Sequence, residues 1–126
     1  MRVAAVGAVE PLSVWPVAQR LAREQRRHRY LVESSAHPGK MLPALAREAI
    51  ERYSRPGELV LDPMCGIGIT LVEAAHLERQ AIGVELEPRW AALAAANIRH
   101  AETQGATGSG IALQGLSMVS PCASSG

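Results

Sequence analysis

Short apolar runs alternate with segments of helical periodicity along the second half of this chain. Three runs have the length and aliphatic content of strands: Glu58 to Asp62, Ala81 to Glu85 and Ile111 to Gln114. The first is apolar at its central positions, which is typical of a parallel strand covered on both faces. Because a helical segment separates each run from the next, we expect an α/β fold with about three parallel strands and flanking helices.

The helical segments are marked by apolar residues three and four positions apart. From Leu42 to Tyr53 these residues form one face of a helix. The same spacing predicts helices from Val14 to Arg29 and from Ile69 to Leu77, and the Ala-rich segment from Pro88 to Ala101 favours another. Between the first two of these helices in the chain, Tyr30 to Val32 is predicted to be a short extended segment.

The two ends of the chain lack these patterns. Residues 1–12 have no usable periodicity, which predicts a mobile leader. Residues 116–126 are rich in Ser, Gly and Ala, which predicts a disordered tail. We therefore expect one folded unit over residues 13–115.

Composition is typical of a soluble globular protein. The 126 residues are 48% hydrophobic with a mean hydropathy of +0.03, enough for the core of one domain. No apolar run approaches the roughly 20 residues of a membrane span, and no signal peptide is recognisable, so we expect a cytoplasmic protein without membrane contact. Cys65 and Cys122 form neither a disulfide framework nor a metal-binding pair, so no metal is expected.

The segment from Asp62 to Thr70 predicts a binding loop between a strand and a helix. Gly66 and Gly68 lack a Cβ, so a ligand can approach the backbone amides at the helix N-terminus. The dinucleotide fingerprint would require a third glycine where this chain has Leu71. The carboxylate of Asp62 would repel a pyrophosphate and suits a ligand that carries an ammonium group.

This loop closely resembles the first motif of the amino-group DNA methyltransferases, the N4-cytosine and N6-adenine enzymes that use S-adenosylmethionine. The family pattern is Asp-Pro, two variable residues, Gly-x-Gly and two hydroxyl residues, of which this chain keeps only Thr70. The segment from His37 to Pro43 resembles the family's cofactor-flanking motif. Ala81 to Glu85 resembles its second strand, and Glu85 follows Gly66 at about the 20 positions that one βαβ unit requires.

The resemblance implies a partial Rossmann-like class I methyltransferase fold, in which residues 13–115 form the cofactor-binding part. It implies S-adenosyl-L-methionine as cofactor, with Glu85 on the ribose hydroxyls and Asp62 facing the ammonium group. Trp90 either flanks the adenine or packs against the sheet edge. Cys65 has no base beside it in any motif and is interpreted as a small apolar filler. The expected cofactor-binding residues are His37, Pro38, Asp62, Pro63, Met64, Gly66, Gly68, Thr70, Glu85 and Leu86.

One part of the family pattern is missing. The catalytic Asp/Asn/Ser-Pro-Pro-aromatic tetrapeptide is absent, because no two prolines are adjacent in this chain. We therefore assign no catalytic residue and expect a truncated methyltransferase, inactive alone, or a subunit completed by another chain at an open sheet edge. Two alternatives stay open: a relative of the RNA methyltransferases of the tRNA guanine-N2 type, and a non-catalytic cofactor-binding or interaction fragment.

A DNA partner is implied by the resemblance and receives little support from charge. The net charge of the chain is only +1. One basic patch near the end of the first predicted helix could contact phosphates, although a solvated helix end explains it as well. The patch consists of Arg20, Arg23, Arg26, Arg27 and Arg29.

Overall fold

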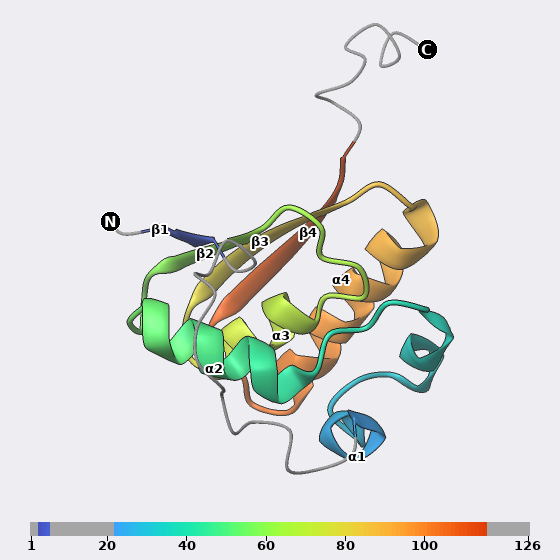
Figure 1. Ribbon diagram of the computed structural model, residues 1–126, viewed down its shortest axis with the longest axis horizontal. Helices are drawn as coiled ribbons and strands as arrows, with labels where there is room; N and C mark the ends of the chain where they lie inside the picture. Colours follow the sequence, from blue (N-terminus) through green and yellow to red (C-terminus); the bar gives the residue numbers. More distant parts are fainter. Residues whose placement is uncertain (1–2, 6–21, 116–126) are drawn as a thin grey trace, which may run out of the picture.

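The computed structural model describes residues 3–5 and 22–115, whose strands form one parallel sheet in the order β1-β2-β3-β4 (Figure 1). The strands are β1 (Val3–Ala5), β2 (Leu59–Asp62), β3 (Gln80–Glu85) and β4 (Ser109–Gln114). The three predicted strands are confirmed as β2, β3 and β4. Strand β4 begins two residues earlier than predicted, because Ser109 and Gly110 pair with β3 despite their weak strand propensity.

Strand β1 corrects the prediction for the N-terminal end. A mobile leader over residues 1–12 is wrong for residues 3–5, which pair in parallel with Leu59 to Leu61. A strand of three residues is too short to show periodicity, and its partner lies far along the chain. The rest of the predicted leader and the predicted tail at 116–126 lie outside the described residues.

The helices are α1 (Ala22–Arg26), α2 (Pro43–Tyr53), α3 (Ile69–His76) and α4 (Pro88–Thr103), with a 3₁₀ helix η1 (Val32–Ala36) between α1 and α2. Helices α2, α3 and α4 confirm the predictions, and α2 and α4 begin at prolines, which suit the first helical turn.

The segment around α1 differs from the prediction. The predicted helix from Val14 to Arg29 ends at Arg26, and its part before residue 22 lies outside the described residues. His28 then takes the left-handed conformation with φ 62°, which a helix does not allow. Of the predicted extended segment, Val32 instead begins η1.

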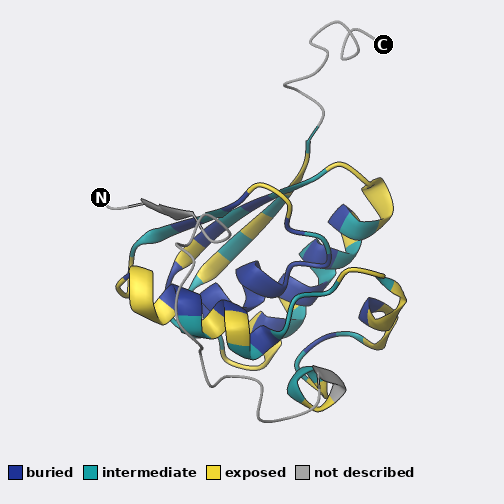
Figure 2. Ribbon diagram, in the orientation of Figure 1, coloured by how far each residue is buried: buried dark blue, intermediate teal, exposed yellow. Residues whose placement is uncertain are grey.

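Helices α3 and α4 pack against one face of the sheet, and α2 packs against α3 (Figure 1). On the covered face Val60 and Ala81 are buried. On the other face Ile111 and Leu113 of β4 are 54% and 49% exposed, and β4 alternates between intermediate and exposed residues (Figure 2). Within the described part of the chain, no helix covers this second face.

We call this second face the open face. The register aligns Leu61, Ile82 and Ile111 across β2, β3 and β4, and aligns Val84 with Leu113. Since partners in register point to the same side of a sheet, these five side chains form one continuous apolar surface. Among the described residues, nothing covers this apolar surface of the sheet.

The two consecutive βαβ units bring the ends of β2 and β3 together. Asp62, the last residue of β2, is in register with Gly83, and the backbone N–H of Cys65 donates to the Val84 carbonyl at 2.9 Å. The loops that follow these two strands therefore lie side by side at the carboxyl edge of the sheet, where ligands of open α/β sheets bind. None of the described helices has the length and apolar content needed to cross a membrane.

Candidate functional site

The loop between β2 and α3 is shaped by Asp62 and two glycines. The Asp62 Oδ1 atom accepts a hydrogen bond from the Met64 backbone N–H at 3.1 Å, which turns the chain away from the strand. Gly66 has φ 53°, and a Cβ there would lie 3.3 Å from His37 Nε2. A side chain at this position would therefore fill the space between the loop and the imidazole ring.

Gly68 serves packing instead. It has φ 88° at the N-terminus of α3, and a Cβ there would lie 3.1 Å from the Cβ of Ala94 in α4. The glycine thus lets the start of α3 approach the backbone of α4. The sequence assigned this residue to cofactor binding, but it does not line the cavity described below.

Glu85 holds two loops together at the end of β3. Its Oε1 atom accepts from the Gly66 backbone N–H at 3.0 Å, and its Oε2 atom accepts from the Glu87 backbone N–H at 2.8 Å. A carboxylate offers about four acceptor positions, so two remain after these bonds. Glu85 therefore orients the glycine loop and can still accept hydrogen bonds from a ligand.

The segment after η1 forms the opposite wall. His37 Nδ1 accepts from the Gly39 backbone N–H at 3.1 Å, and the Lys40 ammonium donates to the carbonyls of Ser35 and His37 at 3.1 and 2.5 Å. The His37 and Trp90 rings meet edge to face with centroids 4.7 Å apart. Trp90 thus packs partly buried against the core and against His37. Its contact with adenine stays a prediction.

These walls enclose a cavity of about 240 Å³ at the carboxyl edge of the sheet. Six of the predicted site residues line it, namely His37, Asp62, Met64, Gly66, Thr70 and Glu85. Pro38, Pro63 and Leu86 are exposed residues outside the lining, and Gly68 is buried outside it. The remaining lining residues are Gly39, Lys40, Met41, Cys65, Ile67 and Ile69.

The cavity carries two carboxylates, Asp62 and Glu85, and the single ammonium of Lys40. Burial raises the pKa of the Cys65 thiol to about 12, and the negative charges of Asp62 and Glu85 contribute. Cys65 therefore stays protonated, in agreement with its interpretation as a filler. A Cβ on Gly83 would lie 2.6 Å from the Cβ of Cys65, which shows how closely the thiol packs on β3.

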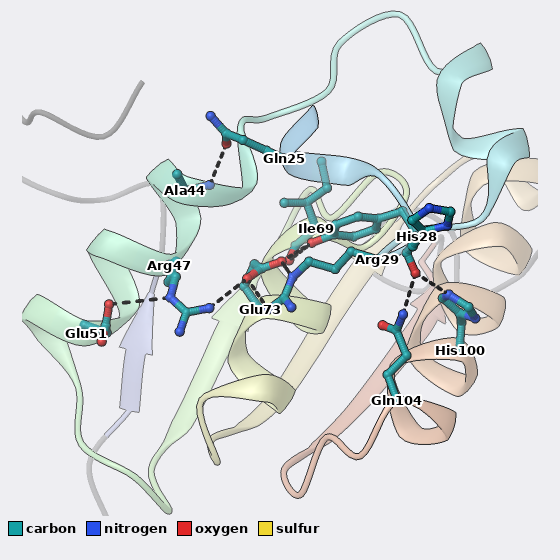
Figure 3. A network of polar contacts seen from close by, with 11 residues as sticks. Gln25, His28, Arg29, Ala44, Arg47, Glu51, Ile69, Glu73, His100 and Gln104 are labelled. Atoms are coloured by element: carbon teal, nitrogen blue, oxygen red, sulfur yellow. Dashed lines mark hydrogen bonds and ion pairs between the residues drawn. The ribbon is translucent and has the colours of Figure 1, made fainter. Parts of the chain in front are cut away.

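A buried carboxylate that the sequence analysis missed lies within α3 and binds the segment before η1. Glu73 is 1% exposed and accepts from Arg29 Nε at 2.7 Å, from Arg29 Nη2 at 2.8 Å and from the Tyr30 hydroxyl at 2.6 Å (Figure 3). The Tyr30 hydroxyl also lies 3.3 Å from the Ile69 carbonyl at the start of α3. Hydrogen bonding to Glu73 raises the pKa of Arg29, and burial raises the pKa of Tyr30 well above its usual value.

This contact changes the interpretation of the basic patch. Arg29 is bound to a buried carboxylate and is neither a solvated helix end nor a free phosphate ligand. The Arg20 and Arg23 side chains lie outside the described residues, so within the described part of the patch only Arg26 and Arg27 remain candidates for phosphate contact.

His76, one turn after Glu73 in α3, has a buried Nε2 atom without a hydrogen-bond partner in the described part of the chain. Burial lowers the pKa of His76, and the positive charges of Arg29, Arg47 and His100 lower it further against the opposing effect of Glu73. The neutral imidazole is therefore the form that the fold favours.

Asn97 in α4 is a second buried polar residue that the sequence analysis missed. Its Oδ1 atom accepts from the Leu31 backbone N–H at 2.8 Å, and its Nδ2 atom donates to Ser34 Oγ at 2.8 Å and to the Ile67 carbonyl at 2.9 Å. The available signal was a single amide within an Ala-rich helix, on the face that packs toward the core.

The chain matches known methyltransferases in sequence. Residues 6–96 match the sequence profile of the DNA methylase family of the N6 and N4 type. The type II methyltransferase M.SmaI of Serratia marcescens is 35% identical over 79 residues, which cover 60% of this chain and 27% of that protein. The tRNA (guanine(10)-N2)-dimethyltransferase of Methanocaldococcus jannaschii is 43% identical over 56 residues, which cover 44% of this chain and 16% of that protein.

A solved structure agrees with this match. A protein described as a DNA modification methylase of Thermus thermophilus, crystallised in complex with S-adenosyl-L-methionine, is 33% identical with a TM-score of 0.50. The alignment covers 77% of this chain and 44% of that chain, so this chain spans less than half the length of the relatives compared. The profile match extends over most of the sequence and includes the glycine loop and Glu85, and the chain therefore belongs to the DNA methylase family.

Proposed function

We propose that this chain binds S-adenosyl-L-methionine in the cavity at the carboxyl edge of the sheet and forms the cofactor-binding half of a DNA methyltransferase. The observation that carries the proposal is Glu85, which is fixed by two backbone N–H groups beside the glycine loop and shares the cavity with Asp62. The substrate class is the exocyclic amino group of cytosine or adenine in DNA.

The side chains fit the cofactor chemically. When bound, S-adenosylmethionine supplies a methyl group activated by a sulfonium cation. Asp62 and Glu85 give the cavity a negative field that favours the sulfonium and ammonium charges. The unused acceptor positions of Glu85 suit the two hydroxyls of a ribose, and Asp62 suits the ammonium group of the methionine part.

The small size of the cavity supports a site that further polypeptide completes. Its volume of about 240 Å³ is below the range of about 300–1,000 Å³ in which pockets enclose most of a drug-sized ligand. The sequence also lacks adjacent prolines and hence the catalytic tetrapeptide. We infer that methyl transfer requires polypeptide that supplies this tetrapeptide, extends the sheet beside β4 and covers the open face.

Calorimetric titration with S-adenosylmethionine tests the cofactor site. Glu85→Gln keeps the shape of the side chain but places an amide against one of two N–H donors, so we expect binding at least about 10-fold weaker, equivalent to ~1.4 kcal/mol. Glu87→Gln is the matched control, because only the backbone of Glu87 contacts Glu85. A folded wild-type chain that shows no saturable binding, or a Glu85→Gln variant with unchanged affinity, would contradict the proposal.

A second substrate class is favoured by one comparison, the 43% identity to a tRNA dimethyltransferase. The alternatives separate in a methylation assay with a completed enzyme that contains this half, offered duplex DNA and tRNA together with labelled cofactor. We expect label in DNA. Label in tRNA alone would transfer the proposal to RNA, and saturable cofactor binding without label in either would favour the non-catalytic alternative.

A further inference from the structure

The cavity has two walls that come from separate parts of the chain. One wall is the glycine loop, which includes Gly66 and Ile67, and the other is the segment from His37 to Met41. The walls meet where the His37 ring lies against Gly66, with its Nε2 atom 3.3 Å from the position that a Cβ on Gly66 would take. The two walls are also connected by hydrogen bonds to one side chain of α4.

Asn97 of α4 makes this second connection between the walls. It is fully buried at 0% exposure and is not among the residues that line the cavity. Both hydrogens of its Nδ2 are used, one toward Ser34 in η1 and one toward the Ile67 carbonyl in the glycine loop. Its Oδ1 atom accepts from the Leu31 N–H just before η1. One side chain on a helix of 16 residues therefore anchors both walls.

We propose that Asn97 is a positioning residue that sets the separation of the two walls and thereby the affinity of the cavity for S-adenosylmethionine, an inference that rests on the function proposed above. Ser34 precedes His37 by one turn of η1, and Ile67 lies between the two glycines of the loop. Without the amide of Asn97, both segments lose their hydrogen bonds to this side chain of α4. The His37 ring then shifts relative to Gly66, and the cavity loses its shape.

A purely structural role for Asn97 would also lower stability, because the Leu31 N–H and the Ile67 carbonyl would each lose a hydrogen-bond partner. Stability alone therefore does not separate the two roles. They differ in the folded state of the variant, where only a positioning role changes the contact between His37 and Trp90. This contact offers a readout that needs no cofactor.

The experiment compares Asn97→Leu, which has similar volume but no hydrogen-bonding group, with Ile98→Ala. Ile98 is buried beside Asn97 in α4 and packs toward β4, so its truncation to alanine also lowers stability. Both are made in a Trp15→Phe background, so that Trp90 is the one tryptophan and can be excited selectively over Tyr30 and Tyr53. The quenching of Trp90 by the His37 ring, measured as the difference in emission between each protein and the same protein carrying His37→Gln, is then compared at one fixed pH.

We expect this quenching to shrink at least twofold in Asn97→Leu and to persist in Ile98→Ala. In titrations at a temperature where each variant is folded, we expect S-adenosylmethionine to bind about 10-fold more weakly to Asn97→Leu and within about twofold of wild type to Ile98→Ala, the tenfold change corresponding to ~1.4 kcal/mol. A His37→Gln variant establishes which part of the quenching comes from His37.

A folded Asn97→Leu variant with wild-type quenching and wild-type affinity would overturn the inference. If that variant does not fold, Ser34→Ala, which removes one of the three hydrogen bonds, gives the decisive measurement, and unchanged quenching and affinity there would overturn it as well. Altered quenching in a protein whose wild-type form binds no cofactor would support the positioning of the walls by Asn97 while refuting the proposed function.

Discussion

Replacing Glu73 by glutamine removes a buried negative charge whose closest partners come from a distant part of the chain. Arg29 and Tyr30 together place three donor atoms within 2.8 Å of the Glu73 carboxylate oxygens, and the side chain is 1% exposed (Figure 3). In the Glu73→Gln variant one oxygen becomes an NH₂ group, which faces donors and leaves the guanidinium of Arg29 without its counter-charge. The variant therefore tests whether this ion pair fastens the segment before η1 to α3.

The expected loss follows from the burial of the pair. Breaking a buried ion pair by removing one partner costs about 3–5 kcal/mol. Because the Arg29 side chain is 26% exposed, water can solvate the guanidinium in part, and we expect about 3 kcal/mol. Domains have total stabilities of about 5–15 kcal/mol, so even at the lower end of this range about 2 kcal/mol is left and the variant stays folded at low temperature. The corresponding fall in Tm is about 12 °C or more.

Thermal and urea unfolding followed by circular dichroism measure this loss. Glu51→Gln is the matched control, because the Glu51 carboxylate is 52% exposed and lies 3.9 Å from Arg47, so its removal should cost less than about 0.5 kcal/mol. A double-mutant cycle with Arg29→Met should give a coupling energy of about 2 kcal/mol between Arg29 and Glu73. A loss below about 1 kcal/mol for Glu73→Gln, or additivity in the cycle, would refute the reasoning.

Three further expectations concern packing and pH. Gly83→Ala should lower the free energy of unfolding by about 1–3 kcal/mol or more, since its Cβ would lie 2.6 Å from that of Cys65. Gly39→Ala is the control and should be nearly neutral, because the nearest atom to its Cβ would be 3.9 Å away. Equal losses for the two variants in urea unfolding would be inconsistent with the contact at Gly83. In a Cys122→Ser chain at about pH 8, a thiol reagent should label Cys65 at least about 100-fold more slowly in the folded than in the unfolded state, because folding raises the pKa of Cys65 to about 12. Equal labelling rates in the two states would show that the folded thiol is ionised. For His76, the pKa in the folded state lies below that in the unfolded chain, so the unfolded state binds more protons below about pH 6.5 and the free energy of unfolding falls there. His76→Gln should lose this part of the pH dependence of stability. An unchanged pH profile in this variant would assign the dependence to other groups.

The sheet and its helices were predictable because their signals are local. The runs of β2, β3 and β4 are bounded by turns, and α2 and α4 begin at prolines that a helix start favours. Strand β1 was not predictable, because three residues carry no period and it is the distant backbone of β2 that makes them a strand. The 3₁₀ helix η1 depends likewise on Asn97, which binds Leu31 and Ser34 from 66 and 63 positions along the chain.

The candidate site was predictable where a motif specifies chemistry. Asp62, Gly66 and Glu85 meet in one cavity as the βαβ spacing requires. Gly68 belongs to the same motif but faces Ala94. This role was not predictable, because a glycine in a sequence does not show whether a ligand or a helix makes the close approach. Glu73 was missed for a different reason: an acid within a helix is normally solvated, and its burial follows only from Arg29, 44 positions away.

The pairing of β1 with β2 also determines the order in which the chain can assemble. Val3 pairs with Leu59, whereas Leu59 pairs with Gln80 and Gln80 with Ser109. The loop that β1 closes is longer than either crossover loop of the βαβ units, so its closure loses more chain entropy, and contacts between such distant segments slow folding. We expect residues 59–114 to form the folding nucleus. During synthesis on the ribosome, β1 therefore cannot pair with β2 until the 53 residues between them and β2 itself have emerged.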